Sequence, residues 1–209
     1  MVGVMELHHP LRVIAPTVDA DVLTVLARAE QEFTISTLER MIETRSAEGI
    51  RLALARLVEQ GIARRRMIGR AHAYSLNRSH LASRAIVELA SLREILIQRM
   101  REAIDGWPES PLYAALFGSA ARGEMGPASD IDILLVRRGG DGTEQWHRQV
   151  DELVGNISEW TGNDARALDL AADDIRGRLT DDPVLADVVR DGIPVHGDPT
   201  ALRRLVGAR

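Results

Sequence analysis

The sequence contains no cysteine and no lysine, and aromatic residues make up only 3% of its 209 residues. The absence of cysteine excludes disulfide bonds, thiol nucleophiles and cysteine-ligated zinc. Because all 26 basic residues are arginines, Schiff-base chemistry and a P-loop lysine are excluded as well. No apolar run approaches the roughly 20 residues that cross a bilayer, and the N-terminus lacks the pattern of a signal peptide. We therefore expect a cytoplasmic protein that does not contact a membrane.

The charges are distributed unevenly along a chain of ordinary globular composition, with 45% hydrophobic and 27% charged residues. Residues 1–80 hold 11 arginines and 9 acidic residues, whereas residues 81–209 hold 15 arginines and 22 acidic residues. Within the first part, residues 45–78 carry eight arginines and only two acidic residues. Such a cluster is typical of a surface that contacts a phosphate backbone, although a solvated face is the alternative. The length allows two small domains with different partners.

The first part of the chain shows the order of a helix-turn-helix fold. Apolar periodicity predicts helices over 18–29, from residue 36 to 42 and over 46–61, with a short extended segment at 33–35. Two further strands within 62–76, joined by a turn at Gly69-Arg70, predict a basic hairpin. The expected order is therefore helix, helix, turn, helix and hairpin.

The end of the third predicted helix and the hairpin after it resemble the winged-helix domains of bacterial transcription regulators. The resemblance rests on Leu57-Val58-Glu59-Gln60-Gly61, which leads into the basic hairpin. It implies that the third helix enters the major groove of DNA and that the hairpin contacts the backbone or the minor groove. A winged helix that makes only protein contacts is the alternative. The residues expected to contact DNA are Ser46, Arg51, Arg56, Arg64, Arg66, Arg70 and His72.

A single connecting helix is expected over residues 80–107, because no glycine or proline interrupts its apolar periodicity before Gly106. A helix of about 25 residues would span roughly 40 Å, which is more than a small domain requires. Part of its apolar face would then pack on a second copy of the chain, so we expect a homodimer.

The most informative motif follows this helix. An apolar stretch at 113–117 leads into Gly118-Ser119, and after ten intervening residues Asp130 and Asp132 open a second apolar stretch. The pattern Gly-Ser, ten residues, Asp-x-Asp, with its flanking strands, resembles the minimal nucleotidyltransferases of the DNA polymerase beta-like superfamily. The alternative is an ordinary strand-helix-strand unit with an acidic strand start.

The residue types of this motif suit nucleotide chemistry. Asp130 and Asp132 are two positions apart, so that on a strand both project from the same face. Their carboxylates suit Mg²⁺ or Mn²⁺ held jointly with nucleotide phosphates. The residues expected to contact the nucleotide are Gly118, Ser119, Arg122 and Ser129.

The resemblance also implies a third carboxylate from a later strand, which would act as base or as metal ligand. Asp169 is the candidate because it alternates with Leu168 and Leu170 on a predicted strand. Asp173 and Asp174 are rivals, but they are better explained as acidic residues in the first turn of a helix.

The sequence as a whole predicts an α+β protein with a winged helix at 1–79, the connecting helix at 80–107 and a minimal nucleotidyltransferase domain with a small mixed sheet at 108–209. The resemblance implies Mg²⁺-dependent (or Mn²⁺-dependent) transfer of a nucleoside monophosphate from a nucleoside triphosphate to a hydroxyl acceptor, with Asp130, Asp132 and Asp169 as catalytic metal ligands. The expected partners are DNA and a nucleoside triphosphate, and the acceptor could be a protein. Two alternatives are a transcription regulator that binds a nucleotide without turnover and an antitoxin-like protein that acts by protein contact.

Overall fold

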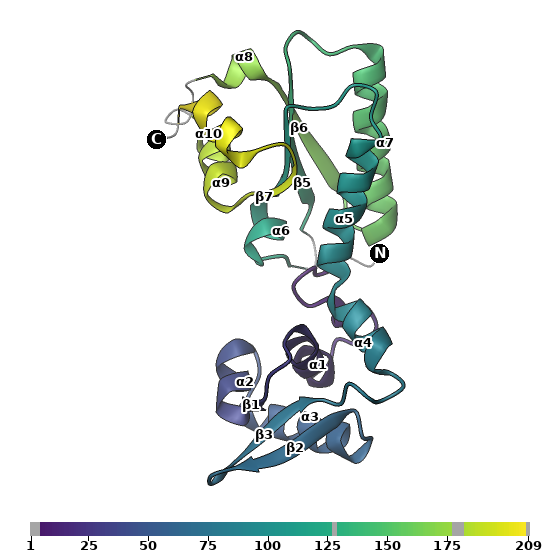
Figure 1. The fold of residues 1–209 in the computed structure, drawn as a ribbon, viewed down its shortest axis with the longest axis vertical. Coiled ribbons are helices and arrows are strands. Elements are labelled where there is room, and N and C mark those ends of the chain that lie inside the picture. The colour runs from purple at the N-terminus through teal and green to yellow at the C-terminus, as the bar shows by residue number, and fades with distance from the viewer. Residues whose placement is uncertain (1–4, 127–128, 177–181, 208–209) are drawn as a thin grey trace. The chain divides into compact units, whose positions relative to one another are not determined.

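The computed structural model describes residues 5–126, 129–176 and 182–207 (Figure 1). The chain divides into two compact units, which we call the N-terminal unit (His9–Arg93) and the C-terminal unit (Met1–His8 with Glu94–Arg209). Helices occur in both units together with small sheets, which confirms the predicted α+β class. Within the described ranges, no helix combines the length and apolarity that a bilayer crossing requires.

The N-terminal unit combines helices with a three-stranded antiparallel sheet in the order β1-β3-β2. Its elements are η1 (Pro10–Val13), α1 (Val18–Arg28), β1 (Phe33–Thr34), α2 (Ile35–Met41), α3 (Ala47–Glu59), β2 (Ala63–Ile68), β3 (Ala71–Leu76) and α4 (Ser83–Ala90). The helices and the hairpin predicted from periodicity are therefore present, with boundaries displaced by one or two residues. The predicted polar break places Ser46 as the N-cap of α3, where its side-chain oxygen accepts a hydrogen bond from the amide of Gly49 at 3.2 Å.

A single apolar core holds the N-terminal unit together. Its largest fully buried side chains come from α1, β1, α2 and α3, namely Leu26, Phe33, Leu38, Ile50 and Leu54. The carboxylate of Asp21 is also buried, and it accepts hydrogen bonds from the Nε–H groups of Arg12 and Arg45 at 2.6 and 2.7 Å. Burial alone would raise the pKa of Asp21, but the two guanidinium groups outweigh it and hold the pKa below its ordinary value.

The expectation of one continuous helix over 80–107 is wrong. The segment forms two helices, α4 and α5 (Leu92–Asp105), separated at Ser91. The backbone of Ser91 leaves the helical region, and its hydroxyl donates a hydrogen bond to the carbonyl of Val87 at 2.9 Å. Ile86 of α4 is buried in the N-terminal unit and Met100 of α5 in the C-terminal unit, so each helix has its own core to cover. The two helices therefore do not form the single long helix whose uncovered face the expected homodimer required.

The C-terminal unit is built on a four-stranded mixed sheet in the order β6-β5-β4-β7, in which β5 and β6 are parallel and the other pairs antiparallel. Besides α5, its elements are β4 (Tyr113–Phe117), α6 (Gly118–Arg122), β5 (Ile131–Arg137), α7 (Glu144–Thr161), β6 (Ala165–Ala171), α8 (Ala172–Ile175), α9 (Pro183–Asp191), β7 (Ile193–His196) and α10 (Pro199–Val206).

Helices cover both faces of this sheet (Figure 1). Alternate residues of β5 are buried on opposite sides: Ile133 belongs to the core beneath α5 and α7, and Leu134 to the core beneath α8, α9 and α10. The central strands are therefore apolar on both faces, which leaves polar side chains to the strand ends and to the edge strand β6.

The start of the chain packs into the C-terminal unit, which differs from the expected first domain at 1–79. Leu7 is fully buried in the core beneath α5 and α7. The side chain of Asn163 pairs with the backbone of Met5, accepting from its amide at 3.0 Å and donating to its carbonyl at 3.3 Å. These contacts place residues 5–8 with the strand ends that carry the Asp-x-Asp motif.

Candidate functional site

A tight bend joins β4 to α6 at Gly118. Its φ of +68° lies in the left-handed region, which favours glycine. A Cβ atom at this position would lie 2.8 Å from Oδ2 of Asp132, so any side chain would collide with that carboxylate. Phe117 and Asp132 are directly paired between β4 and β5, which explains the close approach. The backbone at Gly118 and the carboxylate of Asp132 therefore line the same small space.

The two aspartates of the Asp-x-Asp motif lie close enough for the charge of Asp130 to act on Asp132. Asp130 lies just before β5 and Asp132 is the second residue of the strand. Burial raises the pKa of Asp132, the negative charge of Asp130 raises it further, and the positive charge of Arg166 acts in the opposite direction. The arrangement is a half-buried pair of like charges, which a cation would relieve.

Arg166 is a site residue that the sequence analysis did not identify. It is the Cα partner of Asp132 in the parallel ladder between β5 and β6. Its Nη1 lies 2.8 Å from Oδ2 of Asp130, and its Nη2 lies 3.1 Å from Oδ2 of Asp164. A guanidinium group from the later strand β6 thus lies beside the motif, whereas the resemblance implied that this strand contributes a carboxylate, with Asp169 as the candidate.

Asp169 does not join this site, which corrects its expected role. It is paired with Leu135 rather than with Asp132, three residues further along the ladder, or roughly 10 Å. Since three positions reverse the facing of a strand residue, it also lies on the opposite face of the sheet. There it accepts hydrogen bonds from Nη1 of Arg137 at 2.6 Å and from Nε1 of Trp146 at 2.9 Å. Asp169 therefore joins β5, β6 and α7 and has a structural role.

The remaining residues expected at the nucleotide lie around the bend. Ser119 is half-buried, and its carbonyl accepts hydrogen bonds from Gly123 and Glu124. The hydroxyl of Ser129 accepts a hydrogen bond from the amide of Gly126 at 2.8 Å, so it shapes the loop before Asp130.

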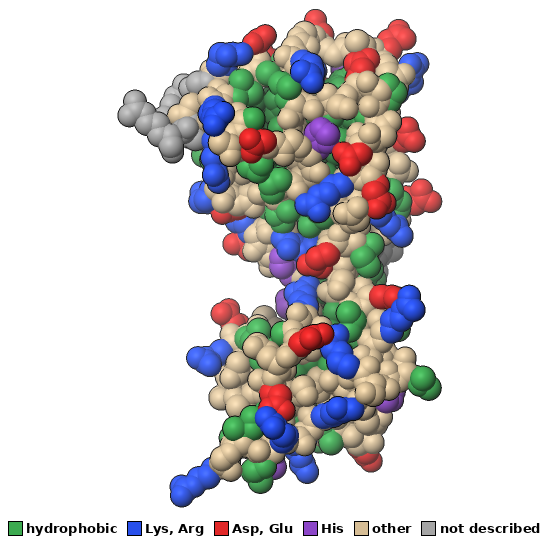
Figure 2. Space-filling view, viewed as in Figure 1, with side chains coloured by type: hydrophobic (Ala, Val, Ile, Leu, Met, Phe, Trp, Pro, Cys, Tyr) green, Lys and Arg blue, Asp and Glu red, His purple; other side chains and the backbone are tan. Residues whose placement is uncertain are grey.

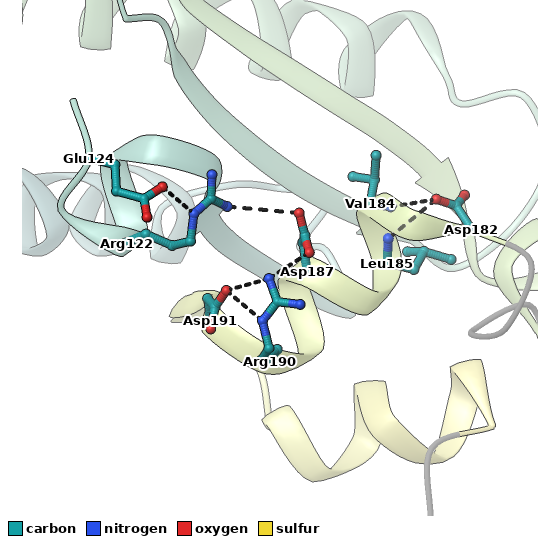
Figure 3. A network of polar contacts seen from close by, with 8 residues as sticks. All are labelled: Arg122, Glu124, Asp182, Val184, Leu185, Asp187, Arg190 and Asp191. Carbon is teal, nitrogen blue, oxygen red and sulfur yellow. Dashed lines mark hydrogen bonds and ion pairs between the residues drawn. The ribbon is translucent and has the colours of Figure 1, made fainter. Parts of the chain in front are cut away.

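Arg122, also expected at the nucleotide, already has acidic partners. Its Nε–H donates to Glu124 at 2.7 Å, and its Nη1 lies 3.8 Å from Asp187 of α9. Figure 3 shows Arg122 pointing away from its own helix toward Asp187, which also pairs with Arg190 at 2.7 Å. Its charge is therefore partly neutralised by α9.

The donor set fits a divalent cation that is shared with a nucleotide. Among the described residues, no cluster of three or more acidic or histidine side chains could hold a metal ion. Mg²⁺ commonly binds through one or two carboxylates together with substrate phosphates, which is what Asp130 and Asp132 can offer. The two carboxylates do not make a complete protein cage, so phosphate oxygens and water would have to complete the coordination.

In the N-terminal unit, all residues expected at DNA are exposed, but three of the arginines already contact acidic side chains. Arg51 pairs with Glu48, Arg56 with Asp19 at 2.6 Å, and Arg66 with Glu32 at 2.7 Å. Ser46 caps its own helix. Arg70 lies at the exposed turn of the hairpin and His72 beside it on β3, and Figure 2 shows basic side chains (blue) over this part of the unit.

The structure separates the three consecutive arginines of β2. Arg65 is paired with Tyr74 across the hairpin, and the two residues line a groove of about 410 Å³ together with Arg51 and His72. Arg64 and Arg66 alternate with Arg65 and project from the other face, where Nη2 of Arg64 lies 3.4 Å from Oγ of Ser79. Arg65 was absent from the residues predicted to contact DNA, yet it shares the groove with α3.

The comparisons with known proteins concern the C-terminal unit. Residues 97–173 match a family model described as a nucleotidyltransferase domain. The matched segment contains the bend at Gly118, the Asp-x-Asp motif and Arg166. The match confirms the resemblance drawn from the motif for this segment of the chain. No curated protein matches the chain.

Several solved structures of low identity are similar to about half of the chain. They include a toxin–antitoxin with AMP-PNP, with 19% identity, a TM-score of 0.36 and coverage of 56% of this chain and 81% of that chain. A tri-AMPylated Shewanella oneidensis HEPN toxin in complex with the MNT antitoxin gives 17% identity, a TM-score of 0.37, and coverage of 55% and 80%. The toxin–antitoxin MntA–HepT gives 17% identity, a TM-score of 0.35, and coverage of 55% and 80%.

Proposed function

We propose that the C-terminal unit binds a nucleoside triphosphate at the Gly118 bend and transfers its nucleoside monophosphate to a hydroxyl acceptor, in a reaction that depends on Mg²⁺ or Mn²⁺. The observation that carries the proposal is the close approach of the Gly118 backbone to the carboxylate of Asp132, where a Cβ atom would not fit, beside Asp130. The match of residues 97–173 to the nucleotidyltransferase domain supports it.

In this reaction, each residue of the site would have its own role. The acceptor oxygen would form a bond to the α-phosphorus and release its proton to water, while the bond between the α-phosphorus and the oxygen bridging to the β-phosphorus breaks, so that pyrophosphate leaves. Asp130 and Asp132 would hold the divalent cation, which when bound neutralises charge on the phosphates during such a displacement. The bend at Gly118 lets the backbone approach the triphosphate closely, and Ser119 follows it with a hydroxyl group.

The proposal is tested by incubating the full chain with labelled nucleoside triphosphates, Mg²⁺ and cell lysate. Label transfer that is lost in Asp130→Ala and in Asp132→Ala supports it. Asp173→Ala is the matched control, because Asp173 is an exposed aspartate of the same unit that pairs with Arg176, just after α8, at 3.4 Å. A protein band that carries the label would identify a protein acceptor. Absence of transfer with every nucleoside triphosphate contradicts the catalytic proposal.

A second candidate is a regulator that binds the nucleotide without turnover. The observation in its favour is that Arg166 contacts Asp130 while Asp169, the expected third carboxylate, lies on the opposite face of the sheet. Saturable nucleotide binding that changes DNA affinity, with no label transfer, would support the regulator over the enzyme. An antitoxin-like protein would instead co-purify with a partner even after both motif aspartates are replaced.

We infer that the N-terminal unit is a winged helix that binds DNA. The order of its elements and the exposed arginines of α3 and β2 support this inference. The groove that holds Arg51, Arg65 and His72 lies between α3 and the hairpin, where a phosphate backbone could contact both. The salt dependence of DNA affinity should become shallower when Arg64, Arg65 and Arg66 are replaced together. An unchanged slope would contradict the assignment of the hairpin.

A further inference from the structure

We propose that Arg166 is a built-in cation of the nucleotide site, which competes with a divalent metal ion for Asp130 and binds the triphosphate when the nucleotide enters. The inference rests on the proposed nucleotide site. According to this inference, Arg166 affects whether the negative charge of Asp130 is balanced by a bound metal ion or by a guanidinium group of the protein.

The position of Arg166 follows from the register of the sheet. In a parallel ladder, paired residues project from the same face, so the side chain of Arg166 lies beside that of Asp132. The neighbouring strand therefore brings a positive group to the two aspartates at the level where a third carboxylate would complete a metal site. Asp169, the nearest acidic residue along β6 in the C-terminal direction, faces the other way.

The contacts of Arg166 fix it at this position. Its guanidinium lies between Asp130, at 2.8 Å, and Asp164, at 3.1 Å. Asp164 is 65% exposed and lies just before β6, so it holds the guanidinium from the solvent side. A cation that binds both Asp130 and Asp132 must displace Arg166 from Asp130 or share the carboxylate with it.

The charge balance gives opposite expectations for metal and for nucleotide. A divalent ion close to a guanidinium is repelled, so Arg166 weakens metal binding by the free protein. Triphosphate oxygens attract the same guanidinium, which forms bidentate hydrogen bonds with phosphate, so Arg166 strengthens nucleotide binding when no metal is present. A residue that only supports the fold would not move these two affinities in opposite directions.

The decisive measurement compares Mn²⁺ binding, by electron paramagnetic resonance without nucleotide, in the full chain and in Arg166→Gln and Arg166→Asp. We expect Arg166→Gln to bind Mn²⁺ about threefold to tenfold more tightly. The variant removes the ion pair that competes for Asp130, which is weak because it is exposed, and it also removes a positive charge that repels Mn²⁺. Arg166→Asp, which adds a carboxylate, should bind it more tightly still. Arg148→Gln is the control, because this exposed arginine of α7 donates a hydrogen bond to the uncharged side chain of Gln145 at 3.0 Å, and the Mn²⁺ affinity of this variant should change less than about twofold.

The second measurement titrates ATP into the same proteins in the presence of EDTA. Arg166→Gln should weaken ATP binding by about fivefold, whereas Arg148→Gln should leave it unchanged. Mn²⁺ affinities that are equal in the full chain, Arg166→Gln and Arg166→Asp would overturn the inference about Arg166. Absence of ATP binding by the unaltered chain, with and without Mn²⁺, would overturn the proposed function instead, because the Mn²⁺ comparison uses no nucleotide. Since Arg166 is exposed on the edge strand, both variants should fold, and circular dichroism checks this.

Discussion

The indole nitrogen of Trp146 donates a hydrogen bond to Oδ2 of Asp169 over 2.9 Å, and so joins α7 to the edge strand β6. The other carboxylate oxygen of Asp169 accepts from Arg137, which is itself only 14% exposed. Asp169 thus completes a half-buried network beneath α7, on the face of the sheet away from Asp132. Such a network stabilises the fold only while each member keeps its partner.

Replacement of Asp169 should therefore lower stability and spare the nucleotide site. We expect Asp169→Asn to reduce the free energy of unfolding by about 1–3 kcal/mol, because the charged partner of Arg137 is lost. Urea denaturation measures this change, and Mn²⁺ and ATP binding should stay as in the unaltered chain. If Asp169→Asn left the stability unchanged but abolished Mn²⁺ binding, Asp169 would instead belong to the metal-binding site.

Asp132 should show the opposite combination of effects. Its pKa is raised in the folded protein, chiefly by burial and then by Asp130, so its stabilising contribution is complete below the ordinary aspartate pKa and is lost as the pH rises through the folded-state value. At neutral pH, Asp132→Asn should therefore be as stable as the unaltered chain or more stable, by about 1 kcal/mol, while Mn²⁺ binding is abolished. The gain should vanish near pH 4, about the ordinary pKa. Denaturation curves at the two pH values measure this difference. A lower stability of Asp132→Asn than of the unaltered chain at neutral pH would contradict the prediction.

The local features of the site could be predicted from the sequence, whereas its third partner could not. The sequence places Gly118 before a helix, and Asp130 and Asp132 two positions apart, and the pairing of Phe117 with Asp132 between β4 and β5 then brings the bend to the motif. The partner of Asp132 depends on the register between β5 and β6, which no local pattern reveals. The alternation of side chains along a strand shows that Arg166 and Asp169 project from opposite faces of the sheet. It does not show which of these faces carries the Asp-x-Asp motif.

The same distinction explains two further differences. No glycine or proline marks the break between α4 and α5 at Ser91. The break lies where one helix packs on the core of the N-terminal unit and the next on the core of the C-terminal unit. The sequence does not distinguish Arg65 from Arg64 and Arg66, because a basic run gives no preference among neighbours, whereas pairing with Tyr74 turns Arg65 toward α3.

Gly118→Ala should impair the site beyond the cost of its backbone strain. Both Gly118 and Gly140 adopt a positive φ, +68° and +69°, but a Cβ at Gly140 would meet no atom within 4 Å, whereas one at Gly118 would meet Asp132. Each alanine variant should lose about 1–3 kcal/mol of stability through strain. Only Gly118→Ala should also weaken Mn²⁺ and ATP binding, by about tenfold or more, as isothermal titration can measure. Equal binding by the two variants would separate Gly118 from the site.

Asp21 should make the N-terminal unit sensitive to acid. Its pKa is held below the ordinary value, because the bonds from Arg12 and Arg45 outweigh the effect of burial. Its stabilising contribution is therefore present above the ordinary aspartate pKa and is lost as the pH falls through the lower folded-state value. Asp21→Asn should cost about 3 kcal/mol at neutral pH and flatten the acid dependence. Asp19→Asn is the control, since Asp19 pairs with the exposed Arg56 and should cost at most about 1 kcal/mol. Equal costs would contradict this account.

Single replacements of the β2 arginines should change the salt dependence of DNA affinity by amounts that depend on the face of the hairpin on which each arginine lies. Arg65 lines the groove beside α3, whereas Arg66 projects from the other face and is already paired with Glu32. If the groove carries DNA, Arg65→Ala should reduce the slope of log affinity against log salt concentration by about 0.9, the amount expected for one lost phosphate contact. Arg66→Ala should change the slope less, because Glu32 already offsets its charge. Fluorescence anisotropy with a labelled duplex at several salt concentrations measures both slopes. A larger change in Arg66→Ala than in Arg65→Ala would move the DNA to the opposite face of the hairpin, where Arg64 and Arg66 lie.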